Sequence, residues 1–290
     1  MPPIQLLALI LFVLATIAVI LTLFRKKMTE GFTQSERFVL KTDGESYDDF
    51  YAKVYDRIHL PEDRIKTELS QILKITGADD NSVFLDVGTG TGETLRHLSE
   101  SGANCVGIEK SPAMVAQTAT KTDAPVKHAD VLEPMAFERA SFTHILCLYQ
   151  TIYEIANKPA FFTNCRYWLR GGGYLVIHLV NKDRFNTVVP VGTPPLIDNP
   201  QKYASKRIVR TEVDFGNFEY VAKYDICDGK CSTFVETFTD TATRNVRQNE
   251  RKLFMESEQD ILAMAGKCGF SQVGKVAVES DEHQAYYILS

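Results

Sequence analysis

Apolar and polar positions follow two different periods along the chain. Short apolar runs predict buried strands at 83–87, 104–109, 126–129, 142–148 and 174–179. Apolar residues at helical spacing predict helices at 48–58, 61–75, 92–101, 112–120 and 158–169, the last one ended by the glycines at 171–173. This alternation predicts an α/β fold, with a doubly wound, mostly parallel sheet that carries helices on both faces.

The alternation stops after the fifth predicted strand. Residues 181–256 contain four stretches rich in aromatic and β-branched residues, separated by turn signals, at 208–214, 218–226, 232–240 and 245–255. We predict an antiparallel β insertion at 181–256, beside or over the mouth of a site. A helix at 258–268 and strands at 272–278 and 284–289 then complete a seven-stranded sheet.

The N-terminus has a pattern of its own. The first 24 residues carry no charged side chain, and residues 4–24 as a helix would span roughly 31 Å, enough for a bilayer core. Arg25-Lys26-Lys27 follows, and such a basic flank stays on the cytoplasmic side. We therefore predict a transmembrane helix in an anchor at 1–27, a polar linker at 28–46, and a single-pass membrane protein whose domain at 47–290 is cytoplasmic. A cleaved signal peptide is the alternative, although residues 1–3 lack its basic start.

The turn after the first predicted strand carries the clearest chemical signal. Asp86 is followed by Gly88, Gly90 and Gly92 before the next helix starts. Glycines let a ligand approach the backbone, and the helix start offers N–H groups. A dinucleotide-binding turn needs a glycine at position 93. Because Glu93 stands there and would repel a pyrophosphate, the turn is compatible with a phosphate-free cofactor and argues against an NAD-dependent reductase.

Two further acidic residues end the next two predicted strands. Glu109 lies about 20 residues after Asp86, the spacing at which a carboxylate binds ribose hydroxyls. Asp130 follows the strand at 126–129, where it could meet an adenine amino group. Together the three acids outline a site for a nucleoside.

These motifs resemble the class I S-adenosylmethionine-dependent methyltransferases over residues 47–290. The resemblance implies S-adenosylmethionine as the cofactor and the insertion as a lid over the acceptor. It also implies a set of residues that hold the cofactor: Asp86, Gly88, Thr89, Gly90 and Gly92 in the loop, Glu109 at the ribose, Lys110, Asp130 and Val131 at the adenine, and the main chain of Cys147 and Leu148 at the amino-acid portion.

Methyl transfer depends mainly on positioning and desolvation, so an obvious catalytic base is not required. The segment 149–154, just past the fourth strand, should lie near the reacting methyl group. The tyrosines at 47, 51 and 55 resemble a cofactor-contacting stripe in small-molecule methyltransferases, with core packing as the alternative. His178 could serve as a general base for a hydroxyl acceptor, or could simply pack in its strand. The catalytic candidates are Tyr51, Tyr149, Gln150 and His178.

The net charge and the cysteine and histidine content limit which ligands and partners we expect. The net charge of −5 disfavours nucleic-acid binding, and the six cysteines and the histidines show no metal-ligand spacing, so we expect no metal and free thiols. Arginines in the insertion, including Arg247 and Arg251, are expected on a solvated face among acidic residues. The predicted acceptor is a small molecule or a lipid-like molecule at the membrane. Methylation of a membrane-associated protein and a non-catalytic cofactor-binding role are the alternatives.

Overall fold

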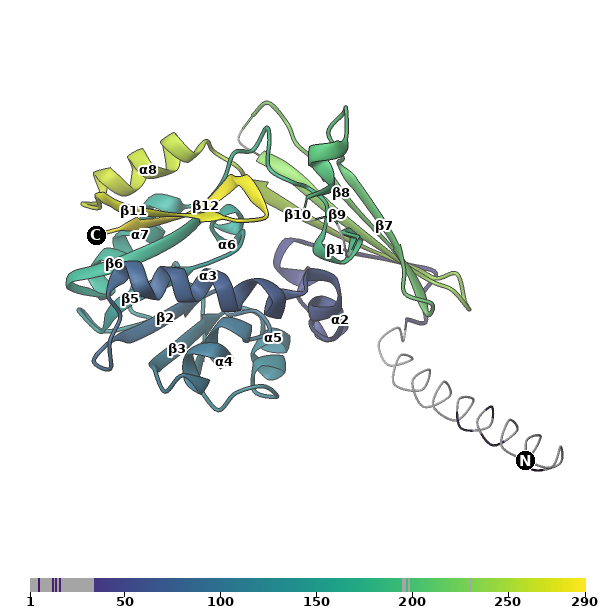
Figure 1. The fold of residues 1–290 in the computed structure, drawn as a ribbon, viewed down its shortest axis with the longest axis horizontal. Helices are drawn as coiled ribbons and strands as arrows, with labels where there is room; N and C mark the ends of the chain where they lie inside the picture. The colour runs from purple at the N-terminus through teal and green to yellow at the C-terminus, as the bar shows by residue number, and fades with distance from the viewer. Residues whose placement is uncertain are drawn as a thin grey trace.

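Two β-sheets lie side by side in the computed structural model (Figure 1). The structure describes residues 34–194, 197, 199–229 and 231–290, together with Gln5, Phe12, Leu14 and Thr16. Helices cover one of the sheets, whereas the other extends as a curved, mostly antiparallel layer. The residues between the two sheets form the candidate site.

The larger sheet has seven strands in the order β11-β12-β6-β5-β2-β3-β4. Its strands are β2 (Val83–Val87), β3 (Asn104–Glu109), β4 (Val126–His128), β5 (Phe142–Cys147), β6 (Leu169–Val180), β11 (Gln272–Val278) and β12 (Asp281–Leu289). Strands β2 to β6 are parallel, and β12 pairs antiparallel with β6. After β4 the chain returns to the other side of β2, so a crevice forms over the carboxyl ends of β2 and β5.

Helices bury both faces of this sheet. They are α2 (Asp49–His59), α3 (Pro61–Thr76), α4 (Glu93–Glu100), α5 (Pro112–Thr118), α6 (Thr151–Glu154), α7 (Lys158–Trp168) and α8 (Glu258–Lys267). Ile65 of α3 and Leu95 of α4 pack in one apolar cluster, and Phe161 of α7 and Ile261 of α8 pack in another. The predicted doubly wound, mostly parallel sheet is therefore confirmed.

The second sheet has five strands in the order β1-β10-β9-β8-β7. Its strands are β1 (Phe38–Thr42), β7 (Arg210–Asp214), β8 (Phe218–Asp225), β9 (Cys231–Asp240) and β10 (Val246–Phe254). Strands β7 to β10 are antiparallel neighbours, close to their predicted positions. This sheet forms the wall that faces the crevice.

Strand β1 corrects the predicted linker at 28–46. Phe38–Thr42 pairs in parallel with β10, with Phe38 opposite Val246, and a 3-10 helix, η1 (Asp43–Ser46), follows it. The partner strand lies about 200 positions later along the chain. The residues that pair with β1 are therefore far from it in the sequence, and the local pattern around β1 could not reveal the strand. The five-stranded sheet consists of the insertion together with this N-terminal strand.

The glycines at 171–173 do not end a helix, as the sequence suggested, but lie inside β6. Helix α7 ends at Trp168, and β6 starts at Leu169. A Cβ atom on Gly173 would lie 2.8 Å from the backbone oxygen of Thr143 in β5. A glycine is needed there because two backbones approach closely.

The predicted single-pass membrane protein is also corrected. None of the helices in the described ranges is long and apolar enough to cross a bilayer. The segment 4–24, on which that prediction depended, lies almost entirely outside the described residues.

Candidate active site

The loop after β2 is held in a conformation that requires glycine. Gly88, Gly90 and Gly92 have φ angles of +67°, +58° and +87°. The N–H of Gly88 donates to the Ile108 carbonyl oxygen at 2.9 Å, which fixes the loop against β3. A Cβ atom on Gly88 would lie 2.6 Å from Cγ2 of Thr151 in α6. The loop therefore presents bare backbone to the crevice.

Glu109, at the end of β3, holds the far side of this loop. Its two oxygens accept hydrogen bonds from the backbone N–H groups of Gly90, at 2.9 Å, and Ser111, at 2.8 Å. Burial raises the pKa of Glu109, and these N–H groups oppose the rise. Each carboxylate oxygen keeps a lone pair that a ligand hydroxyl could use.

Asp86 lies at the base of the loop and is 4% exposed. Burial raises its pKa to about 7, a hydrogen bond with Thr89 opposes this rise, and the nearby charge of Glu109 adds to it. The carboxyl group of Asp86 therefore changes its charge near neutral pH.

The raised pKa of Asp86 predicts a pH-dependent stability. In the folded protein Asp86 holds its proton up to about pH 7, whereas the usual value is 3.8. Wild-type stability should therefore fall as the pH rises from about 4 to about 7, at up to about 1.4 kcal/mol per pH unit. We expect Asp86→Asn to gain unfolding free energy relative to the wild type across this window, measured by urea unfolding from pH 4 to 8.

The matched control for this prediction is Asp79→Asn. A hydrogen bond from the N–H of Asn81 holds the pKa of Asp79 below its usual value. The charge of Asp79 therefore changes only below about pH 3.8, so this variant should show the same pH dependence as the wild type between pH 4 and 8. Identical pH profiles for Asp86→Asn and the wild type would contradict the assignment.

Beyond Glu109, a second polar cluster lies at the ends of β3 and β4. Lys110 Nζ is 2.7 Å from Oδ2 of Asp130, and the N–H of Leu132 donates to the other oxygen at 2.9 Å. Burial alone would raise the pKa of Asp130, but these hydrogen bonds outweigh it and lower the pKa. The Val131 carbonyl oxygen accepts a bond from Asn164, so this strip of backbone is fixed as well.

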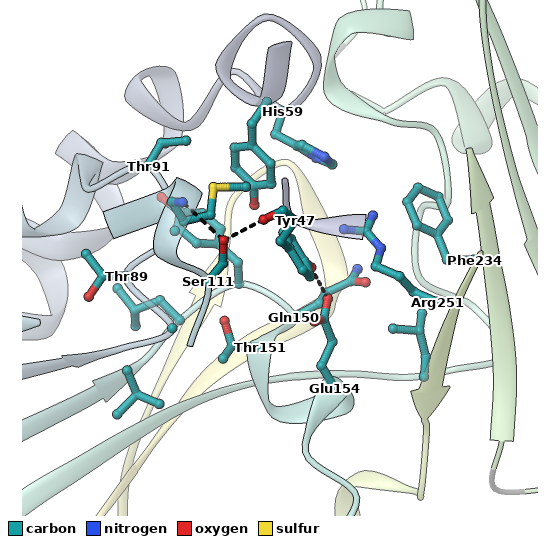
Figure 2. Close-up of a pocket in the computed structure, with 18 of the residues that line it drawn as sticks. Tyr47, His59, Thr89, Thr91, Ser111, Gln150, Thr151, Glu154, Phe234 and Arg251 are labelled. Carbon is teal, nitrogen blue, oxygen red and sulfur yellow. Dashed lines mark hydrogen bonds between the residues drawn. The ribbon is translucent and has the colours of Figure 1, made fainter. Parts of the chain in front are cut away.

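A cavity of about 1420 Å³ joins these groups to the five-stranded sheet. Nine of the predicted cofactor residues line it: Asp86, Gly88, Thr89, Gly90, Glu109, Lys110, Asp130, Val131 and Leu148. Gly92 and Cys147 are not among its lining residues. Phe234 and Arg251 form the opposite wall (Figure 2), and Tyr224 also lines the cavity.

Two of the four catalytic candidates line this cavity. Tyr149 has a φ of +52°, a left-handed conformation that is uncommon for a bulky residue and concentrates at functional sites. Gln150 accepts a hydrogen bond from the hydroxyl of Tyr224 at 3.2 Å, which links the end of β5 to the five-stranded sheet.

The other two candidates, Tyr51 and His178, are buried and do not line the cavity. The Tyr51 hydroxyl accepts a bond from Arg251 at 3.0 Å. His178 contacts the Tyr149 carbonyl oxygen through Nδ1, and burial lowers its pKa to about 3. His178 therefore holds the backbone of Tyr149 from behind rather than facing a substrate.

The side chains of Tyr47, Glu154 and Arg251 converge on the centre of the cavity. The sequence pointed to Tyr47 and to the segment 149–154 that contains Glu154, but it placed Arg251 on a solvated face. The Tyr47 hydroxyl donates to Oε1 of Glu154, and the guanidinium of Arg251 lies 5.0 Å from the centre of the Tyr47 ring (Figure 2). The Tyr47 carbonyl oxygen also accepts a bond from the Ser111 hydroxyl at 2.5 Å. Tyr47 thus joins Ser111, next to the loop after β2, to Arg251 of the five-stranded sheet.

Arg251 corrects the prediction of a solvated arginine face. It is 5% exposed, and Nη2 lies 2.8 Å from Oε2 of Glu236, which is itself fully buried. The Tyr220 hydroxyl donates to the other oxygen of Glu236 at 2.7 Å. Arg247 is also buried and binds Asp48, which starts α2. The signal in the sequence was their spacing of four within a strand, an even number that places Arg247 and Arg251 on one face.

Comparisons with known proteins agree with this geometry. Residues 85–177 match the family model of a methyltransferase domain. The structure is similar to an S-adenosylmethionine-dependent methyltransferase from Clostridium acetobutylicum, with 14% identity, 83% of this chain and 97% of that chain covered, and a TM-score of 0.62. No curated protein matches the chain by sequence.

Two further structures resemble it. The sugar N-methyltransferase KedS8 from Streptoalloteichus shares 22% identity over 77% of this chain and 85% of that chain, with a TM-score of 0.56. DesVI from Streptomyces venezuelae shares 17% over 82% and 97%, with a TM-score of 0.58. At these identities the structures support the fold alone. The domain match supports the predicted enzyme, a methyltransferase, and the fold agrees with its predicted cofactor, S-adenosylmethionine.

Proposed function

We propose that this enzyme methylates a small molecule that binds between the glycine loop and the five-stranded sheet. The observation that carries the proposal is the cavity itself, which continues from the loop to Arg251 and Phe234. Its volume of about 1420 Å³ exceeds the range of roughly 300–1,000 Å³ that single ligands usually occupy. It therefore has room for a cofactor and a small acceptor together. The likeness to the sugar N-methyltransferase KedS8 agrees with such an acceptor.

Within this proposal the cofactor lies along the carboxyl ends of β2, β3 and β4. S-adenosylmethionine supplies an electrophilic methyl carbon on a positively charged sulfur. The backbone at 88–90 would hold its amino-acid portion, Glu109 its ribose, and Asp130 with Val131 its adenine. The bare backbone of Gly88, which a Cβ atom would block, and the acidic groups beside it fit a cation without phosphates.

The lipid-like acceptor depended on the predicted membrane anchor and is not part of this proposal. The cavity wall is instead rich in paired polar groups. Gln150 and Tyr224 are bonded to each other, and Asp281 accepts a bond from the N–H of Asn186 at 2.7 Å. Such a lining suits a polar small molecule.

Ligand-induced thermal shift tests the cofactor half of the proposal. S-adenosylmethionine and S-adenosylhomocysteine should each raise the melting temperature, because a ligand that binds only the folded state stabilises it. NAD should give no shift, since Glu93 stands where a dinucleotide-binding turn needs its last glycine. A large shift with NAD and none with the methyl donor would overturn the proposal. Transfer of labelled methyl groups to protein but not to small molecules would reject the acceptor half.

A further inference from the structure

Glu154 is the acidic side chain at the centre of the cavity. It ends α6, three residues after Thr151, which packs against Gly88 of the cofactor loop. Its carboxylate accepts the hydroxyl hydrogen bond of Tyr47. In the described parts of the chain, no lysine, arginine or histidine nitrogen lies within 4.0 Å of this carboxylate. Glu154 therefore offers a negative charge without a direct counter-ion, beside the cofactor loop (Figure 2).

The two arginines at this end of the cavity already have counter-ions. Arg64 lies 3.3 Å from Glu68, and Arg251 lies 2.8 Å from Glu236. An anionic acceptor would therefore meet two cations that already have carboxylate partners, and it would also meet the carboxylate of Glu154, which has no cation in direct contact. A cationic acceptor would meet an available carboxylate, which forms stronger hydrogen bonds with charged donors than with neutral ones.

Arg251 has one more feature that bears on the acceptor. Its Nε atom is buried without a hydrogen-bond partner, while the guanidinium lies 5.0 Å from the rings of both Tyr47 and Phe234. An unsatisfied buried N–H is costly unless a ligand atom completes it. An acceptor oxygen, such as a hydroxyl or ether, is suited to this position.

The histidine in the cavity gives a hydroxyl acceptor little help with deprotonation. His59 is the histidine that lines it, and burial lowers the pKa of His59 to about 3. A neutral amine needs no strong base because its nitrogen already carries a free electron pair. In water at neutral pH an amine is mostly protonated, and this ammonium form needs only to lose its extra proton.

We propose that the acceptor is a small primary or secondary amine that also carries oxygen atoms, and that Glu154 is a catalytic residue that binds its ammonium group. This inference rests on the proposed function. The ammonium N–H bond breaks, its electron pair stays on nitrogen, and the proton passes to the carboxylate of Glu154. The nitrogen then forms a bond to the methyl carbon as the carbon–sulfur bond breaks, and that electron pair remains on sulfur as a neutral thioether.

The first experiment identifies the chemical class of the product. The full-length enzyme is incubated with S-adenosylmethionine labelled in its methyl group and the small-molecule fraction of a lysate from the source cells. Labelled products should be bases that bind a cation exchanger at neutral pH and leave it at alkaline pH. Neutral or acidic labelled products would overturn the amine acceptor alone. Label in no small molecule, although the methyl donor binds, would reject the proposed function as well.

Glu154→Gln then tests the role of the carboxylate. Calorimetric titration should give the same affinity for S-adenosylmethionine as the wild type, within about twofold. The kcat/KM for the amine should fall about 100-fold at neutral pH, the usual range for removing a proton-transfer group. The deficit should shrink as the pH rises and the amine enters already deprotonated. Equal rates for the variant and the wild type at neutral pH would contradict the assignment.

The matched control is Glu138→Gln. Glu138 is exposed and does not line the cavity, so the same chemical change should alter neither the affinity for the methyl donor nor the rate. A comparable loss in this control would show that the effect at Glu154 reflects overall charge.

Discussion

Gly88→Ala is expected to weaken the binding of S-adenosylmethionine by about 10- to 100-fold without unfolding the protein. The new Cβ atom would lie 2.6 Å from Cγ2 of Thr151 at a φ of +67°. Strain of this kind costs roughly 1–3 kcal/mol, and each 1.4 kcal/mol is a factor of ten in affinity. The loop would relieve the strain by moving its backbone, which is the surface that the cofactor contacts. Calorimetric titration measures the loss.

Two variants separate the clash from the backbone strain. Gly77→Ala has a similar φ of +63° but no atom within 4 Å of the new Cβ, so it should lower stability and leave the affinity unchanged. Adding Thr151→Ser to Gly88→Ala removes the clashing methyl group and should restore part of the affinity. Unchanged affinity in Gly88→Ala would show that the loop does not contact the cofactor.

Arg251→Met is expected to lower the free energy of unfolding by about 3–5 kcal/mol, because it leaves the fully buried carboxylate of Glu236 without its cation. This is a large part of the total stability of an ordinary domain. Urea unfolding at neutral pH measures the change. The double variant with Glu236→Gln should recover much of the loss, since it buries no uncompensated charge.

The control for this loss is Arg244→Met, which breaks an ion pair of the same chemistry at the surface. Arg244 lies 2.8 Å from Glu219, and their side chains are 62% and 48% exposed. Water screens such a pair, so its loss should lower the free energy of unfolding far less than Arg251→Met does. Equal losses for the two arginine variants would contradict the account of a buried charge network.

The seven-stranded sheet could be predicted because its strands are defined by local pattern. The run Val83–Val87 is apolar and ends in a glycine turn, and the structure has a strand over the same residues. The prediction that the glycines at 171–173 end a helix was wrong because these residues serve a contact between two strands of the folded sheet. Gly173 is small in order to admit the backbone of Thr143, and no local pattern carries that information.

In the candidate site, too, the residues that local pattern defines could be predicted and those that meet only in the folded protein could not. Residues for the cofactor lie at the carboxyl ends of strands or just beyond them, at Asp86, Glu109 and Asp130, so their order along the chain places them at one edge of the sheet. The acceptor wall comes from residues far apart in the sequence. Tyr47 and Arg251 meet because η1, which ends just before Tyr47, packs against β10. Arginine is usually exposed, so its residue type gave no sign of the buried pair with Glu236.

The parallel pairing of β1 with β10 also constrains the order in which the protein can form during synthesis. Strand β1 emerges from the ribosome about 200 residues before its partner. At about 5–20 residues per second, it waits roughly 10–40 s with its backbone unpaired. The edge of the five-stranded sheet is therefore completed late, after the strands that carry the cofactor loop have left the ribosome.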